Sequence, residues 1–194
     1  MRRRITDGRG SLRAAPSRWD AGRYSSATGA GVVVLLLLFA LLTGCSSIDV
    51  DATIDQGLEA MERGDIEAAE TAFLDVLDEE PENVYALFNM GLIEAERSRV
   101  DLAEGYYRSA AEEDPSFVPA LYNLALLRAE ADDSVEAIDL YRKVIFLEPT
   151  HAEGHLNLGL LLLDAGQLDD AEAQLEQAIA LDPALAARLP NAGD

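Results

Sequence analysis

The feature that most constrains the fold of this chain is a set of four prolines spaced 34 residues apart. Pro81, Pro115, Pro149 and Pro183 each follow a glutamate or an aspartate. A fixed period between about 20 and 50 residues indicates an array of repeated structural units. Proline lacks an amide hydrogen and disfavours a helical residue before it, so each of these acid-proline pairs is expected to end a helix.

Three further columns follow the same period when the proline is taken as position 32 of a unit. The units then span 50–83, 84–117, 118–151 and 152–185. Positions 8 and 20 are always small, which lets two helices of one unit cross closely. Position 8 reads Gly57, Gly91, Ala125 and Gly159, and position 20 reads Ala69, Ala103, Ala137 and Ala171. Position 24, expected to be the large residue packed behind position 20, reads Phe73, Tyr107, Tyr141 and Leu175.

These columns resemble the tetratricopeptide repeat (TPR) family, whose units are 34-residue helix-turn-helix pairs. The resemblance implies an all-α fold, a right-handed superhelical solenoid of four repeats over residues 50–185. One pair cannot bury its apolar stripe alone, so neighbouring pairs stack into one continuous core. In the last unit we expect helices over 152–164 and 168–181, with a turn at Gly166-Gln167, and residues 186–194 form a C-terminal tail.

The two ends of the array differ from its middle. Thr53 and Gln56 stand in the first unit where later units carry mainly apolar residues, as expected of a polar capping repeat. At the other end only Ala184 to Leu189 offers a partial cap. Part of the last apolar face is therefore expected to be exposed, or covered by a partner or a second copy.

The N-terminal segment reads as an export signal. Eleven strongly apolar residues, Val32 to Leu42, follow an arginine-rich stretch. This run is shorter than the roughly 18–20 residues of a membrane-spanning helix and fits a signal peptide. Leu42-Thr43-Gly44-Cys45 resembles the lipobox of bacterial lipoproteins, which implies removal of residues 1–44 and attachment of diacylglycerol to Cys45. The alternative is a short membrane anchor with an incidental cysteine.

Lipidation would place the protein in the cell envelope, with residues 45–50 as the lipidated cysteine and its tether. Two or three acyl chains give stable anchoring where a single chain does not. In Gram-negative lipoproteins an aspartate after the cysteine favours retention in the inner membrane. Ser46 occupies that place here, so we expect the periplasmic face of the outer membrane if the organism has one.

Charge excludes one class of partner. From Cys45 onward the chain carries eight basic and 34 acidic residues, a net charge of −26. This strongly acidic part of the chain repels the phosphates of nucleic acids and anionic lipid headgroups, and it attracts basic segments. Cys45 is the only cysteine, so neither an internal disulfide nor a cysteine-based zinc site is expected.

The TPR resemblance also implies a binding surface. In that family the first helices line a concave groove that holds an extended peptide or a helix, through positions 2, 5, 6, 9, 12 and 13. The predicted groove residues are Tyr85, Phe88, Asn89, Leu92, Glu96, Tyr122, Asn123, Leu126, Glu130, Leu156, Asn157, Leu160 and Asp164.

Two columns of this surface carry polar chemistry. Asn89, Asn123 and Asn157 at position 6 could hydrogen-bond a peptide main chain, because an amide both donates and accepts. Local packing is the alternative role for these amides. Position 13 is acidic in every unit, although an acid near the C-terminal end of a helix is unfavourable with the helix dipole. This column therefore predicts a row of acidic side chains that favours a basic partner. The alternative is coincidence, because the whole chain is rich in acids. This column reads Glu62, Glu96, Glu130 and Asp164.

No pattern for catalysis stands out. His151 and His155 lie four residues apart, but a third ligand is lacking and position 4 normally packs, so we expect no metal site. There is neither a phosphate-binding glycine loop nor a nucleophile motif, and we expect no cofactor beyond the lipid on Cys45.

These features together predict a protein-binding adaptor of the envelope. The setting suggested by fold analogy is pilus or outer-membrane assembly. The alternative is a structural lipoprotein that dimerises through its incompletely capped last repeat. A small-molecule or ion-binding subunit is a weaker alternative, because convergent polar residues are lacking.

Overall fold

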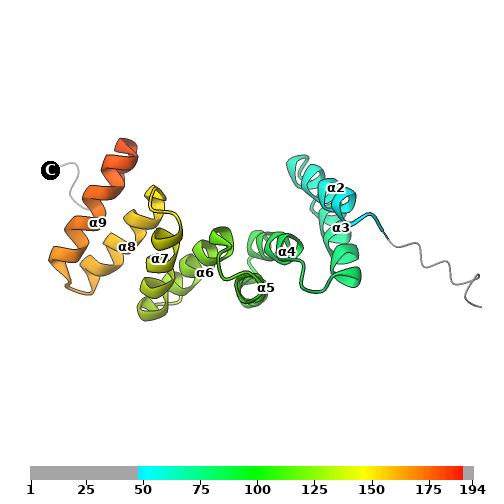
Figure 1. Ribbon diagram of the computed structural model, residues 1–194, viewed down its shortest axis with the longest axis horizontal. Coiled ribbons are helices and arrows are strands. Elements are labelled where there is room, and N and C mark those ends of the chain that lie inside the picture. The colour runs from blue at the N-terminus through cyan, green and yellow to red at the C-terminus, as the bar shows by residue number, and fades with distance from the viewer. Residues whose placement is uncertain (1–47, 190–194) are drawn as a thin grey trace, which may run out of the picture. The chain divides into compact units, whose positions relative to one another are not determined.

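The computed structural model describes residues 48–189, and within this range the chain forms α-helices and one 3₁₀ helix, without strands (Figure 1). The elements in chain order are α2 (Val50–Glu62), α3 (Ile66–Glu79), α4 (Val84–Glu96), α5 (Val100–Glu113), α6 (Val118–Glu130), α7 (Ser134–Leu147), α8 (Ala152–Asp164), α9 (Leu168–Leu181) and η1 (Pro183–Arg188). The predicted all-α array of four helix pairs is confirmed. The last pair, α8 and α9, has the bounds expected from the sequence.

The helices pack in strict sequence order. Each first helix (α2, α4, α6, α8) contacts the second helix of its own repeat, and each second helix contacts the first helix of the next repeat (Figure 1). The first helices begin 34 residues apart, at Val50, Val84, Val118 and Ala152. Stacking of this kind buries the apolar stripe of every pair against its neighbours.

The acid-proline pairs close the second helices as expected. Glu80, Asp114, Glu148 and Asp182 are the C-cap residues of α3, α5, α7 and α9, and each donates its amide N–H to the carbonyl four residues earlier. Several helices start on a side-chain cap. The Asp65 carboxylate accepts the Ala68 amide at 3.2 Å, for example. Such caps satisfy amide groups that have no partner within the helix.

The turn inside each pair requires a left-handed backbone at repeat position 15. Gly64 has φ +73° and Gly166 has φ +75°, while Ser98 and Asp132 adopt φ values of 58° and 60°. Glycine takes this conformation without a steric penalty. The second and third repeats therefore accept a small backbone strain that the first and fourth avoid.

The predicted close crossing of the two helices in a pair is confirmed. A Cβ atom added to Gly57 would lie 2.7 Å from the ring of Phe73, and one added to Gly159 would lie 2.7 Å from Leu175. A Cβ atom added to Gly91 would lie closer still to the ring of Tyr107. Position 8 is therefore small because the side chain at position 24 occupies the space where a larger residue would go.

The predicted signal segment, Cys45 and residues 190–194 lie outside the described residues. Among the helices of the described part, none is long and apolar enough to cross a membrane.

Candidate functional site

A pocket of about 260 Å³ lies between the first helices α6 and α8. Four of its lining residues belong to the predicted groove set: Leu126, Glu130, Asn157 and Leu160. Ala129, Leu161 and Tyr141 complete the lining, the last of these from the second helix α7. The sequence pattern thus brings together four predicted residues from two repeats around one apolar depression.

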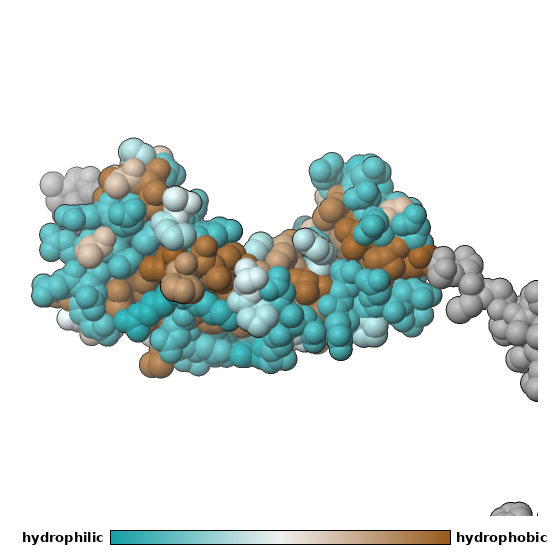
Figure 2. All heavy atoms as spheres, viewed as in Figure 1, coloured by the Kyte–Doolittle hydropathy of each residue, from teal (hydrophilic) through white to brown (hydrophobic). Residues whose placement is uncertain are grey.

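Helical spacing explains why these side chains converge. Leu126 and Glu130 are four residues apart on α6, and Asn157 and Leu160 are three apart on α8, so each pair shares a helix face. The face of the molecule drawn in Figure 2 carries apolar surface over α6, α7 and α8, bordered by hydrophilic side chains. We call the surface formed by positions 2, 5, 6, 9, 12 and 13 of α2, α4, α6 and α8 the first-helix surface.

Asn157 is the polar centre of the pocket. Its side-chain amide donates hydrogen bonds to the hydroxyls of Tyr122 at 3.1 Å and Tyr141 at 3.3 Å. Burial raises the pKa of the Tyr141 phenol well above its usual value, and burial likewise raises the pKa of Tyr122. Both phenols therefore stay neutral at physiological pH, and the cluster joins α6, α7 and α8 without a formal charge.

The other two asparagines of the column bond within their own helices. Asn89 is 6% exposed and donates to the carbonyl of Tyr85 at 2.8 Å. Asn123, which is partly exposed, donates to the carbonyl of Pro119 at 2.9 Å. Local packing thus accounts for Asn89, while Asn123 and Asn157 keep amide groups at the surface or at the pocket. A main-chain contact to a bound peptide stays a prediction for these two residues.

Aromatic side chains form a second part of the first-helix surface. Tyr85 is 60% exposed and meets Phe117 edge to face, with ring centroids 5.6 Å apart. Phe88 packs against the same ring at 5.4 Å. Phe117 and its counterpart one repeat later, His151, both occupy position 34. The His151 ring packs against Tyr122 at a tilt of 36°, with ring centroids 4.8 Å apart. Sequence reasoning missed this column, although aligning position 34 across the repeats would have revealed it.

Leu156 does not belong to the exposed surface, and its assignment to the groove is wrong. Its side chain is fully buried in a cluster with Ala178 and Leu185. The reason is the 3₁₀ helix η1, which places Leu185 over the last repeat and covers this position. The equivalent residues Phe88 and Tyr122 of earlier repeats remain partly exposed.

The two histidines make structural hydrogen bonds. The Nδ1 atom of His151 accepts the amide N–H of Gly154 at 3.0 Å and caps α8. The ring nitrogens of His155 lie 2.8 Å from Gln174 Oε1 and 3.1 Å from the Pro149 carbonyl oxygen. Within the described residues, no group of three or more metal-ligating side chains is gathered.

The acidic column at position 13 lies at the C-terminal ends of the first helices. Its members are exposed, and none forms an ion pair with another described residue: Glu62, Glu96, Glu130 and Asp164. The helix dipole adds partial negative charge at the same ends. The potential at this edge of the first-helix surface is therefore negative, and it favours cationic groups.

Comparison with known proteins identifies the repeats and relates the fold to solved structures. Family models described as tetratricopeptide repeat match residues 54–117 and 128–189. No curated protein matches the chain. A crystal structure of MamA protein is 25% identical over 71% of this chain and 75% of its own, with a TM-score of 0.63.

Two further solved structures resemble the chain in fold. A tetratricopeptide repeat protein from Parabacteroides merdae is 23% identical over 69% of this chain and 54% of its own, with a TM-score of 0.61. The structure titled as a functional characterization of Pseudomonas aeruginosa pilF is 24% identical over 69% of this chain and 61% of its own, also with a TM-score of 0.61.

Proposed function

The chain belongs to the tetratricopeptide repeat family, and from that premise we propose that it is a membrane-anchored, non-enzymatic scaffold that holds a segment of a partner protein on its first-helix surface. The observation that carries the proposal is the pocket between α6 and α8. Four of the residues that line it were predicted as groove residues from the sequence. An apolar depression with a few fixed polar groups is the usual form of a recognition site.

The pocket and its rim favour one kind of partner segment. Leu126, Leu160 and Leu161 provide the apolar lining, and burying one aliphatic or aromatic side chain there stabilises a complex by about 1.5–3 kcal/mol. Glu130 stands in the same lining and supplies a negative charge. The preferred ligand is therefore an extended peptide or a helix that carries an apolar anchor next to a lysine or an arginine.

Anchoring through Cys45 completes the proposal. Helix α2 begins at Val50, so only residues 46–49 separate the lipidated cysteine from the first repeat. At about 3.5 Å per extended residue this tether reaches less than about 20 Å, so the repeats work close to the membrane. We place the protein in the cell envelope, at the periplasmic face of the outer membrane in a Gram-negative organism, with pilus or outer-membrane assembly as its setting.

Self-association through the last repeat is the second candidate function. The observation in its favour is an apolar pocket of about 290 Å³ on α9, lined by Leu168, Leu175 and Ile179 among others. Glu172 and Glu176 line the same pocket. In a symmetric dimer each face meets its own copy, so these carboxylates would face like charges. The first-helix surface is therefore the stronger candidate.

Affinity capture from envelope extract tests the proposal with a matched pair of variants. Leu160→Gln alters the pocket, whereas Phe146→Gln removes an 81% exposed apolar side chain that does not line it. We expect one envelope protein to be captured by the wild type and by Phe146→Gln, and to be lost with Leu160→Gln. Equal capture by both variants would show that the pocket is not the binding site.

The anchor needs its own measurement. Cys45→Ser removes the thiol that accepts the lipid, so the protein should move from the membrane fraction to the soluble fraction, or remain as uncleaved precursor. A Cys45→Ser variant that stays in the membrane fraction at the size of the mature wild-type protein would contradict lipid anchoring through Cys45.

A further inference from the structure

The junctions between repeats follow a rule that can be read from their contacts. We call the contact between a second helix and the first helix of the next repeat a junction. At the first junction, Glu70 of α3 receives two hydrogen bonds from the guanidinium of Arg97, at 2.8 and 2.7 Å. At the second, Glu104 of α5 pairs with Arg128 of α6. Both acids occupy repeat position 21, and the arginines occupy positions 14 and 11 of the following repeat.

At the third junction the same repeat positions meet, but an apolar pair replaces the ion pair. There position 21 is Ile138, and position 11 of the next repeat is Leu162; both are buried in the same core cluster. An acid at position 21 thus accompanies an arginine from the next first helix, and an apolar residue accompanies a leucine. The residue at position 21 therefore indicates what the next helix must carry.

Each internal first helix also buries an apolar side chain at position 7. Met90, Leu124 and Leu158 are at most 2% exposed and share core clusters with the position 24 residue of the preceding repeat. Position 4, three residues earlier, is likewise buried in these helices, as Leu87, Leu121 and His155. The helix that docks at a junction with an acid thus presents two apolar side chains three residues apart and then an arginine.

The C-terminal face of α9, the side that would meet a following repeat, has the features of such a junction, and among the described residues only the short 3₁₀ helix η1 follows it, without a further α-helix. Glu172 occupies position 21, and no described residue forms an ion pair with it. Leu175, at position 24, and Ile179 line the pocket of about 290 Å³ beside it. Leu189, which falls at position 4 of a next repeat, lines the pocket too. The face of α9 therefore carries both parts of such a junction, the acid at position 21 and the apolar pocket beside it.

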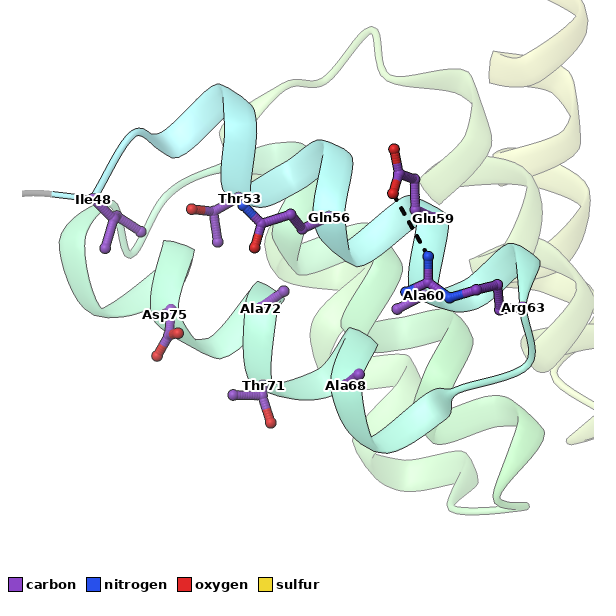
Figure 3. A pocket seen from close by; sticks show the side chains of 10 residues that line it. All are labelled: Ile48, Thr53, Gln56, Glu59, Ala60, Arg63, Ala68, Thr71, Ala72 and Asp75. Atoms are coloured by element: carbon purple, nitrogen blue, oxygen red, sulfur yellow. Dashed lines mark ion pairs between the residues drawn. The ribbon is translucent and has the colours of Figure 1, made fainter.

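The first helix of a second copy of this chain, α2, does not have the side chains that the face of α9 would bind. The N-terminal face of α2 carries Thr53 and Gln56 at positions 4 and 7, and these polar side chains line a pocket of about 540 Å³ (Figure 3). Arg63 stands at position 14 but pairs with Glu59 at 3.6 Å. Helix α2 thus has the arginine without the apolar pair, and the acidic charge of the chain opposes contact between two copies.

We infer that the C-terminal face of α9 is a second docking surface. It binds an amphipathic helix of a partner protein in the place that the first helix of a fifth repeat would take. That helix carries apolar side chains at i and i+3 and an arginine at i+7 or i+10, and the guanidinium pairs with Glu172. This surface is separate from the first-helix surface, so a partner can occupy one, the other or both.

The chain itself supplies a probe with this pattern. A capped, fluorescein-labelled peptide of residues 117–131 contains Leu121, Leu124 and Arg128, which occupy the second junction in the protein. Fluorescence anisotropy measures its binding to the full-length protein in detergent. We expect saturable binding that weakens about fivefold with Glu172→Gln, as for a partly exposed ion pair. The Arg128→Gln peptide should lose the same factor, with no further loss against Glu172→Gln.

The controls separate this surface from the other possible sites. Glu130→Gln alters the first-helix surface, so binding should be unchanged; a loss there, or none with Glu172→Gln, would overturn the inference. Absence of saturable binding would also overturn it, as would binding that appears only when residues 190–194 are deleted. Concentration-dependent mass in sedimentation that Arg63→Gln abolishes would assign the face to a second copy instead.

Discussion

Replacing the position 6 asparagines one at a time should separate a structural amide from an exposed one. Asn157 donates to two tyrosine hydroxyls, and Tyr141 is only 1% exposed. Asn123 donates to the Pro119 carbonyl of its own helix and is partly exposed. The same change to alanine at the same repeat position therefore removes different interactions.

The magnitudes follow from these environments. In Asn157→Ala the buried Tyr141 hydroxyl loses its partner, which costs about 1–3 kcal/mol, whereas water can replace the amide at Tyr122. Alanine returns about 0.5 kcal/mol of helix propensity at either site. We expect Asn157→Ala to lower the free energy of unfolding by about 1–2 kcal/mol, and Asn123→Ala to leave it nearly unchanged.

Thermal and urea unfolding followed by far-ultraviolet circular dichroism measures the difference. A loss of 1–2 kcal/mol corresponds to a fall in Tm of roughly 3–6 °C for a domain of this size. If Asn123→Ala destabilised the protein as much as Asn157→Ala, the reasoning from the tyrosine hydroxyls would be refuted. The result also decides how the binding surface can be tested, because a variant that unfolds cannot report on a groove.

Three further predictions concern the frame that holds the site, each measured by chemical denaturation. Gly91→Ala forces a methyl group into the buried ring of Tyr107 and should destabilise by about 1–2 kcal/mol after the gain in helix propensity; unchanged stability would contradict this. The hydrogen bond from Arg97 lowers the pKa of Glu70 below 4.5, so its contribution is present above that pH and is lost as pH falls through the lowered pKa. Glu70→Gln should therefore lose less stability than the wild type between pH 7 and pH 3, and equal losses would argue against the pair. His151→Ala removes the cap of α8 and should cost about 1 kcal/mol, whereas His151→Asn retains an acceptor; identical behaviour of the two would rule out the capping role.

The sequence sufficed to predict the fold because the period is written in residues whose role is steric. A glycine such as Gly57 against Phe73, or a proline after an acid, has one structural consequence that does not depend on distant parts of the chain. Helix bounds, pair order and the small-to-large contacts therefore follow from the pattern alone. The lining of the pocket by Leu126 and Leu160 follows in the same way from helical spacing.

The burial and hydrogen bonds of the site residues were less predictable where a side chain has several possible neighbours. Periodicity assigns Leu156 to the same face as Tyr122, but only the structure shows that Leu185 of η1 covers it. Asn89 and Asn157 occupy the same column, yet one bonds its own helix and the other bonds two tyrosines. These outcomes depend on which residues the preceding repeat or η1 places nearby, and a single column does not contain that information.

Site-specific photocrosslinking in cells tests the central claim most directly, because it reports contact at one position of the folded protein. A photoreactive phenylalanine analogue at position 160 lies in the pocket, and the same analogue at position 146 lies on exposed surface outside it. We predict a discrete crosslink to one envelope protein from position 160 and none to that protein from position 146. The same crosslinks from both positions, or a crosslink from position 146 alone, would contradict a partner-binding role for the first-helix surface.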